Sequence, residues 1–235
     1  FLLGAFFTVE FVLLFIAVDL TTVARVSVIF YSMPVWLAIA SHFLLPGDRI
    51  TARKALGLAL AVGGVALAMA GRDASAGEAS LLGDVLALCA AMCWAGIALT
   101  VRATPISREA PEVQLLWQVV VSAIAMLAIA PLFGPLIRDL QPVHLWGLAF
   151  LTVVVVTAGF IFWFWLLTIY PASGVASFSF LSPVFGVFFG WLILDERIGP
   201  ALLGALALVA AGLLLINRPA RAGQAAAATS AQTGR

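Results

Sequence analysis

Phe30-Tyr31-Ser32-Met33-Pro34-Val35-Trp36 places a proline inside an apolar run, and the pattern recurs as Ser179-Phe180-Leu181-Ser182-Pro183-Val184-Phe185. Each copy is followed by an apolar run, then a short turn (Gly47-Asp48-Arg49-Ile50 or Asp195-Glu196-Arg197-Ile198), then a glycine-containing apolar run. Pro34 and Pro183 are 149 residues apart, and Arg49 and Arg197 are 148 apart. A repeat this long, made of membrane-length apolar segments, is typical of transporters built from two related halves.

The composition predicts an integral membrane protein. Of the 235 residues, 64% are hydrophobic and 10% are charged, whereas a soluble domain carries about 25% charged residues. Mean hydropathy is +1.16, so lipid must be the solvent for most of the chain. The net charge of +1 gives no indication of a nucleic-acid partner.

The chain divides into apolar stretches of about 20 residues, long enough to cross a bilayer as helices. Gly, Pro and short polar breaks separate them. We therefore predict an all-α protein with eight transmembrane helices, at roughly 1–19, 23–45, 53–70, 81–101, 113–131, 144–168, 172–194 and 200–217. The segment 218–235 is an Ala/Gln/Ser/Thr tail that has too few large apolar residues to build a core, and we expect it to be disordered.

Lys and Arg in the loops predict the orientation. With eight spans both ends lie on one side, which then holds eight of the twelve basic residues, against four on the other side. We expect the basic side, and hence both ends of this chain and its tail, to be cytoplasmic. The eight are Arg49, Arg53, Lys54, Arg102, Arg108, Arg218, Arg221 and Arg235; the four are Arg25, Arg72, Arg138 and Arg197.

This orientation makes the two copies of the repeat inverted. The Pro34 segment runs from outside to inside, and the Pro183 segment runs the opposite way. An odd number of spans per unit produces this inversion, and a five-span unit fits. We expect residues 81–217 to form a complete unit and residues 1–71 to form the last three helices of another, so that the first copy lacks two spans.

The duplicated proline segment with its acidic-Arg-Ile turn, and Leu82-Gly83-Asp84-Val85-Leu86-Ala87-Leu88 leading to Trp94, resemble the EamA family of the drug/metabolite transporter superfamily. The resemblance covers residues 1 to about 217. It implies ten spans in two inverted five-span units, export or exchange of small metabolites or drug-like solutes, and a bacterial inner-membrane location. It also makes Trp94 a candidate cavity residue.

Pro34 and Pro183 each remove a backbone hydrogen bond inside a span and favour a kink. Inverted-repeat transporters place such broken helices around a site near the membrane midplane. Tyr31 and Phe180 precede the two prolines at equivalent positions and are candidates to line that site from both halves. The alternatives are packing kinks and ordinary core or lipid-facing aromatics.

Glu10 lies near the middle of the first span, where an acidic residue costs on the order of 3 kcal/mol. It should therefore face a cavity or a partner. One hypothesis is that it binds a cationic group of a substrate or a coupling proton. The alternative is a structural pair with Arg25, which begins the second span and is also a candidate site residue.

Other residues suggest weaker roles. Gln114 and Gln118 share a helix face and would offer hydrogen bonds to a solute or hold helices together. Ser182, Gly186 and Gly190 form a small-residue face for close helix packing, and it is a candidate oligomer contact. Cys89 and Cys93 are interpreted as small buried hydrophobes. We expect Asp48-Arg49 and Glu196-Arg197 to cap helix ends.

The sequence indicates no enzyme, cofactor or metal site. It lacks a His-Glu-x-x-His pair, a Gly-x-Gly-Asp motif and a phosphate-binding Gly-Lys-Thr loop. We predict a secondary transporter that moves a small solute by alternating access. The alternative is a membrane scaffold or assembly subunit, which would explain the packing faces but not Glu10 beside duplicated proline breaks. A polar cavity that reaches Glu10 between the halves would favour transport over a scaffold.

Overall fold

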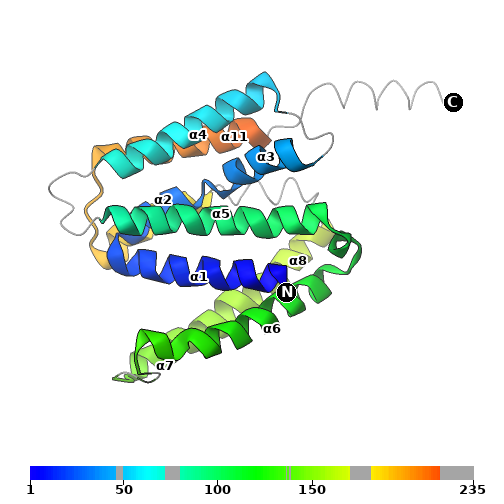
Figure 1. Cartoon of the computed structure of the whole chain (residues 1–235). Helices are drawn as coiled ribbons and strands as arrows, with labels where there is room; N and C mark the ends of the chain where they lie inside the picture. Colours follow the sequence, from blue (N-terminus) through cyan, green and yellow to red (C-terminus); the bar gives the residue numbers. More distant parts are fainter. Residues whose placement is uncertain (46–49, 72–79, 136, 138, 170–180, 218–235) are drawn as a thin grey trace.

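The computed structural model describes residues 1–45, 50–71, 80–135, 137, 139–169 and 181–217, and this part of the chain is helical without strands. It is an all-α multi-pass membrane protein (Figure 1). The α-helices are α1 (Leu2–Leu20), α2 (Val23–Phe30), α3 (Met33–Leu44), α4 (Ala52–Ala70), α5 (Leu81–Ala103), α6 (Pro111–Ile129), α7 (Pro142–Phe150), α8 (Gly159–Ile169), α10 (Ser182–Leu194) and α11 (Pro200–Asn217). Short helical segments, namely η1 (Pro105–Arg108), η2 (Ala130–Phe133) and the π-helical η3 (Leu151–Ala158), join or extend them.

Six helical stretches in the described part are long and apolar enough to cross a membrane. Two shorter apolar helices, at 142–158 and 182–194, accompany them. The predicted sixth span is continued by α8, so the helical path runs from Pro142 to Ile169 without a break. Of the predicted seventh span, 172–194, the structure describes only residues 181–194. The count of eight spans therefore stays a prediction.

The predicted break before Pro34 is present. Helix α2 ends at Phe30, α3 begins at Met33, and Pro34 stands in the first turn of α3, where its missing N–H costs nothing. Ser32 bridges the break, because its buried hydroxyl donates to the Ile29 carbonyl at 2.7 Å and accepts from Trp36 Nε1 at 3.0 Å. The Ile29 carbonyl at the break is thus satisfied inside the protein, as the membrane interior requires.

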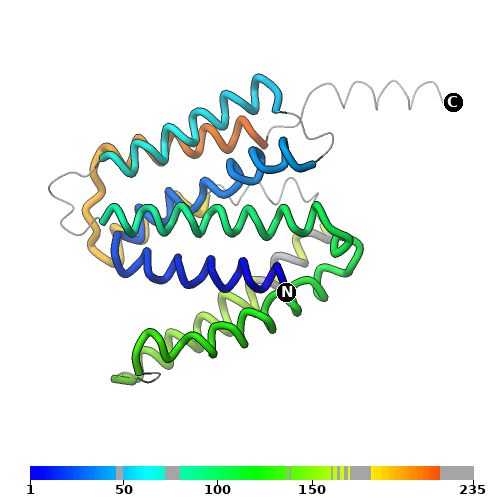
Figure 2. Tube along the Cα trace, viewed as in Figure 1, coloured from blue at the N-terminus to red at the C-terminus, as the bar shows by residue number. Residues whose placement is uncertain are grey.

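Helices α4 and α11 lie side by side (Figure 2) because glycines bring their backbones together. A Cβ added to Gly57 would lie 2.7 Å from the Gly212 carbonyl oxygen, and one added to Gly64 would lie 2.8 Å from the Ala205 carbonyl oxygen. Such approach is the usual way in which small residues join helices in lipid. Gly57, Gly64 and Gly212 are therefore packing positions.

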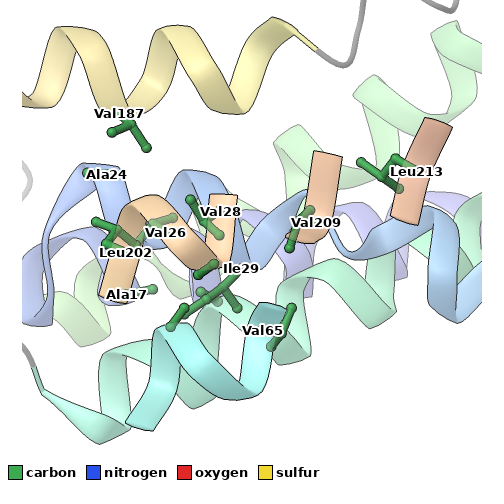
Figure 3. Packing of buried hydrophobic residues seen from close by; sticks show 13 residues of the cluster. Ala17, Ala24, Val26, Val28, Ile29, Val65, Val187, Leu202, Val209 and Leu213 are labelled. Atoms are coloured by element: carbon green, nitrogen blue, oxygen red, sulfur yellow. The ribbon is translucent and has the colours of Figure 1, made fainter. Parts of the chain in front are cut away.

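The core lies where α2 is surrounded by α4, α5, α10 and α11 (Figure 3). Val28 and Ile29 of α2 are fully buried there beside Val209 and Leu213 of α11. Helix α1 packs on the other face of α5 and also contacts α6. By contrast, the described side chains from α7 through α8 are almost all exposed. The firm part of the fold is therefore α1–α5 with α10 and α11.

Candidate functional site

Glu10 is buried inside α1. Only 3% of the residue is exposed, and its Oε2 has no hydrogen-bond partner among the described residues. Close packing on both sides of α1 produces this burial: the Phe6 ring covers Gly96 of α5, and Gly4 lies against Val121 of α6. We expected Glu10 to face a cavity or a partner. The structure buries it without a partner for Oε2 among the described residues, so that expectation stays a prediction.

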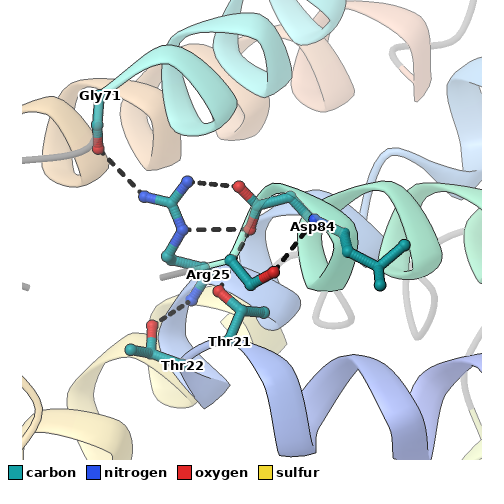
Figure 4. Close-up of polar contacts among 7 residues, drawn as sticks. Thr21, Thr22, Arg25, Gly71 and Asp84 are labelled. Atoms are coloured by element: carbon teal, nitrogen blue, oxygen red, sulfur yellow. Dashed lines mark hydrogen bonds and ion pairs between the residues drawn. The ribbon is translucent and has the colours of Figure 1, made fainter. Parts of the chain in front are cut away.

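Arg25 does not pair with Glu10, so the alternative of a Glu10–Arg25 pair is wrong. Its guanidinium binds Asp84 of α5 through two hydrogen bonds, of which Nε to Oδ1 measures 3.1 Å (Figure 4). Arg25 Nη1 also donates to the Gly71 carbonyl at 3.0 Å, and the Thr21 hydroxyl donates to Asp84 Oδ1 at 3.3 Å. The physical reason is position, since Arg25 lies in the first turn of α2, beside the first turn of α5 and far along α1 from Glu10.

We call Thr21, Arg25, Gly71 and Asp84 the Arg25 cluster. Arg25 is 3% exposed and Asp84 is fully buried. Together they join the end of α1, the start of α2, the end of α4 and the start of α5. The bidentate geometry satisfies most of the donors and acceptors that burial removes from water.

Glu196, which follows α10, holds the same end of α2. Its Oε1 accepts from the Val23 N–H at 2.6 Å, and its Oε2 accepts from the Ala24 N–H at 2.9 Å. A carboxylate at a helix N-terminus satisfies free N–H groups and complements the helix dipole. Glu196 is thus a helix cap, as expected, but for α2 rather than for a helix beside it in sequence.

A cavity of about 740 Å³ lies between α1 and the helices after α5. Its lining is mostly apolar, with Asp19 and His144 as the titratable side chains. The cavity does not include Glu10. Its lining from α1 is Val12, Phe15, Ile16 and Asp19, and from later elements it includes Met126, Ile129, Phe133 and His144.

The remaining predicted site residues are not gathered in that cavity. Tyr31, Pro34, Trp94 and Gln118 are half-buried, and Pro183 is buried at the start of α10. Phe180 lies outside the described residues.

Gln114 has a local role that the sequence did not suggest. Its side-chain amide donates to the Glu109 carbonyl at 2.9 Å, because Gln114 lies in the first turn of α6, next to the loop that precedes it. Its amide nitrogen is therefore engaged with the backbone, which disfavours both a solute contact and an interhelical contact for that group.

The small-residue face of α10 is occupied within this chain, which corrects its candidacy as an oligomer contact. A Cβ on Gly190 would meet the Glu196 carboxylate at 2.6 Å and Ala24 of α2 at 3.4 Å, and a Cβ on Gly186 would collide with Ser27 of α2. Glycine at these two positions leaves the space that α2 needs to pack against α10. Close helix packing is confirmed, and the partner is α2.

Asp84 is the site residue that sequence reasoning missed, because it was treated only as part of a span edge. A usable signal was present, since Arg25 and Asp84 are opposite charges in the first turns of two spans that begin on the same predicted side. No cluster of three or more His, Cys, Asp or Glu side chains that could hold a metal is found within the described ranges.

Comparison with known proteins agrees with this architecture. A family model described as the EamA-like transporter family matches residues 1–70 and 81–218. The chain is 27% identical over 193 residues to the uncharacterized transporter YoaV of Bacillus subtilis (strain 168), covering 81% of this chain and 65% of the relative. It is also 27% identical over 206 residues to the uncharacterized transporter YvbV of the same strain, covering 86% and 65% respectively.

One solved crystal structure shares the fold, with a TM-score of 0.56 and 22% identity, over 90% of this chain and 72% of the other. The chain thus spans about two thirds of the length of the curated relatives it matches. The match of the family model extends over the helical segments before residue 71 and after residue 80. With its membrane-length helices and its broken second span, the chain belongs to the EamA-like transporter family.

Proposed function

We propose that the protein is a secondary transporter that moves small metabolites or drug-like solutes across the bacterial inner membrane by alternating access. Both ends of the chain face the cytoplasm in this proposal. Family membership and the transporter names of the two relatives support it. They favour a carrier over an enzyme.

The observation that carries the proposal is the buried carboxylate of Glu10. A carboxylate inside a membrane span is costly, and a side-chain partner would normally offset the cost. Glu10 Oε2 has none among the described residues. A group held in this state is suited to bind a coupling proton or a cationic part of a solute when that partner enters.

The cavity between α1 and the α6–α7 region supports solute binding. Its volume of about 740 Å³ falls within the range of small-molecule sites, about 300–1,000 Å³. The lining is apolar with one carboxylate and one imidazole, which suits an amphipathic solute. Glu10 does not line this cavity. A solute in the cavity would reach Glu10 only after the helices rearrange, and alternating access includes such a rearrangement.

A scaffold role remains the competing function. The closely packed α4–α11 and α2–α10 pairs fit a scaffold equally well. A scaffold, however, gives no reason to retain the unpaired carboxylate of Glu10.

The test begins with a metabolite export profile of cells with and without the full-length protein. The solute found is then followed at several external pH values with the protein and its Glu10→Gln variant. We expect Glu10→Gln to abolish the pH dependence of transport, because the amide keeps the shape of the side chain but exchanges no proton.

Glu112→Gln is the matched control, since Glu112 is exposed in the first turn of α6. It should retain the parental pH profile. A Glu10→Gln variant whose transport keeps the parental dependence on pH would disprove the role of Glu10. Identical export profiles with and without the protein would favour the scaffold.

A further inference from the structure

The Arg25 cluster and Glu196 connect two parts of the chain at one end of the molecule. Arg25 belongs to residues 1–71, whereas its partner Asp84 belongs to residues 81–217. The cap runs between the same two parts, because Glu196 binds the N-terminus of α2. The Arg25–Asp84 pair and the Glu196 cap therefore both connect residues 1–71 with residues 81–217.

These contacts close the end of the bundle beyond Glu10. The Ser80 N–H donates to the Leu20 carbonyl at 3.2 Å, so even the backbones of α1 and α5 meet there. A Cβ on Gly83 would lie 2.9 Å from Thr21 Cβ, which leaves no space between the two helices. Water from this side meets the Arg25 cluster before it can reach the Glu10 region between α1 and α5.

The chemistry of the closure differs from that of the α4–α11 contact. Backbone atoms and apolar side chains make the α4–α11 contact, and neither would gain free energy from the entry of water. A buried ion pair gains little net free energy, because desolvation of both charges offsets their attraction. When water enters, both charges are solvated again, and the pair separates at a low cost. An ion pair of this kind therefore holds the helices in one specific arrangement and still separates readily.

We propose that the Arg25–Asp84 pair, together with the Glu196 cap, is a gate that opens and closes access to the Glu10 region from one side of the membrane. This inference rests on the transport cycle proposed above. Arg25, Asp84 and Glu196 act as positioning residues and do not touch the solute. The distribution of basic residues places the gate on the outer side.

Cys93 supplies a built-in reporter of the gate. It lies nine residues after Asp84 on α5, hence about 14 Å deeper along the helix, and α5 packs along α1, the helix that carries Glu10. A thiol at this place reacts with a water-soluble reagent only when water reaches it, since the thiolate is the reacting form.

The experiment labels the full chain in membrane vesicles of both orientations with an impermeant quaternary-ammonium methanethiosulfonate. The thiolate forms a mixed disulfide with the reagent and releases methanesulfinate. Cys89→Ser leaves Cys93 as the single thiol, and Cys89→Ser/Cys93→Ser gives the background. We expect Asp84→Asn to raise the labelling rate of Cys93 at least tenfold from one side only.

Asp139→Asn is the matched control, because Asp139 is an exposed carboxylate on the same predicted side. It should leave the labelling rate within twofold of the parent. The charge-swapped Arg25→Asp/Asp84→Arg variant should bring the rate back toward the parental value, which a purely structural effect of Asp84→Asn would not do.

If Asp84→Asn fails to accumulate in the membrane, Arg25→Lys replaces it. Lysine keeps the charge but loses the forked geometry, and it should raise labelling from the same side. An unchanged labelling rate in a folded variant, or equal increases from both sides, would overturn the gate. Labelling needs no solute, so a failed search for a substrate would count against the proposed function and not against the gate.

Discussion

At the level of single residues, Arg25 and Asp84 depend on each other more than on any other group named above. Both are withdrawn from water, and each satisfies the charge of the other. Glu10, in contrast, is buried with one carboxylate oxygen unsatisfied among the described residues. The two sites therefore have opposite physical characters. One is a balanced ion pair, and the other is a single buried carboxyl group whose Oε2 has no partner among the described residues.

This dependence predicts a non-additive loss of stability. Arg25→Met or Asp84→Ala alone should each cost about 3–5 kcal/mol, because each leaves an uncompensated buried charge. The double variant should cost clearly less than the sum, since neither charge then remains. Reversible unfolding in mixed detergent micelles measures all three. A double variant whose cost equals the sum of the two single costs would show that the two side chains act independently.

The same residues show where sequence reasoning was sufficient and where it failed. The expectation that Glu10 faces a cavity or a partner came from hydropathy alone, because a charge in mid-span is informative by itself. The pairing of Arg25 with Asp84 depends on the approach of two helices whose spacing in sequence says nothing about contact. Glu196 likewise caps a helix more than 170 residues away, which no local motif reveals.

At the level of helices, glycine determines which pairs touch. Gly57 faces a carbonyl oxygen of α11, whereas Gly63, on the same helix, has nothing within 4 Å of an added Cβ. The two glycines are chemically identical, so the difference between them isolates packing from helix propensity. They provide a matched pair of substitutions within α4.

Gly57→Ala should destabilise the protein by about 1–3 kcal/mol, because the new methyl group forces α4 and α11 apart. Gly63→Ala should be neutral or stabilising by up to about 1 kcal/mol, since alanine is the better helix former. Thermal unfolding of the two variants in the same detergent compares them directly. Equal midpoints would show that the α4–α11 contact is not close-packed in solution.

Helix positions were predictable because apolar length and Gly/Pro breaks are local properties. The proline predicted a kink inside the second span. The structure has a break between Phe30 and Met33, with Pro34 in the first turn of α3. The π-helical segment η3 was not predicted, since its Thr152–Thr157 contact, in which the Thr157 hydroxyl donates to the Thr152 carbonyl at 2.8 Å, carries no sequence signature that we used.

For the molecule as a whole, packing is uneven. Residues of α2, α4, α5, α10 and α11 share one core, whereas no described side chain of α7, η3 or α8 is buried. Local stability follows the number of buried apolar contacts. The protein therefore has a firm part and a loosely held part within one chain.

This unevenness predicts different rates of hydrogen exchange in detergent. Backbone amides of α7 through α8 should exchange faster than those of α4 and α11, because local opening there exposes little apolar surface that was buried before. Mass spectrometry of peptides from both regions measures the difference. Equal protection would show that other protein surface covers α7 through α8 under those conditions.

The α4–α11 contact has a consequence for the ancestry of the chain. A shift of 148 residues turns Gly57 into Ala205 and Gly64 into Gly212, and the observed contacts, Gly57 with Gly212 and Gly64 with Ala205, exchange under that shift. Reciprocal contacts of this kind define an isologous interface between two identical subunits. Two copies of one helix packed face to face would make the same reciprocal contacts, with a small residue at each crossing point.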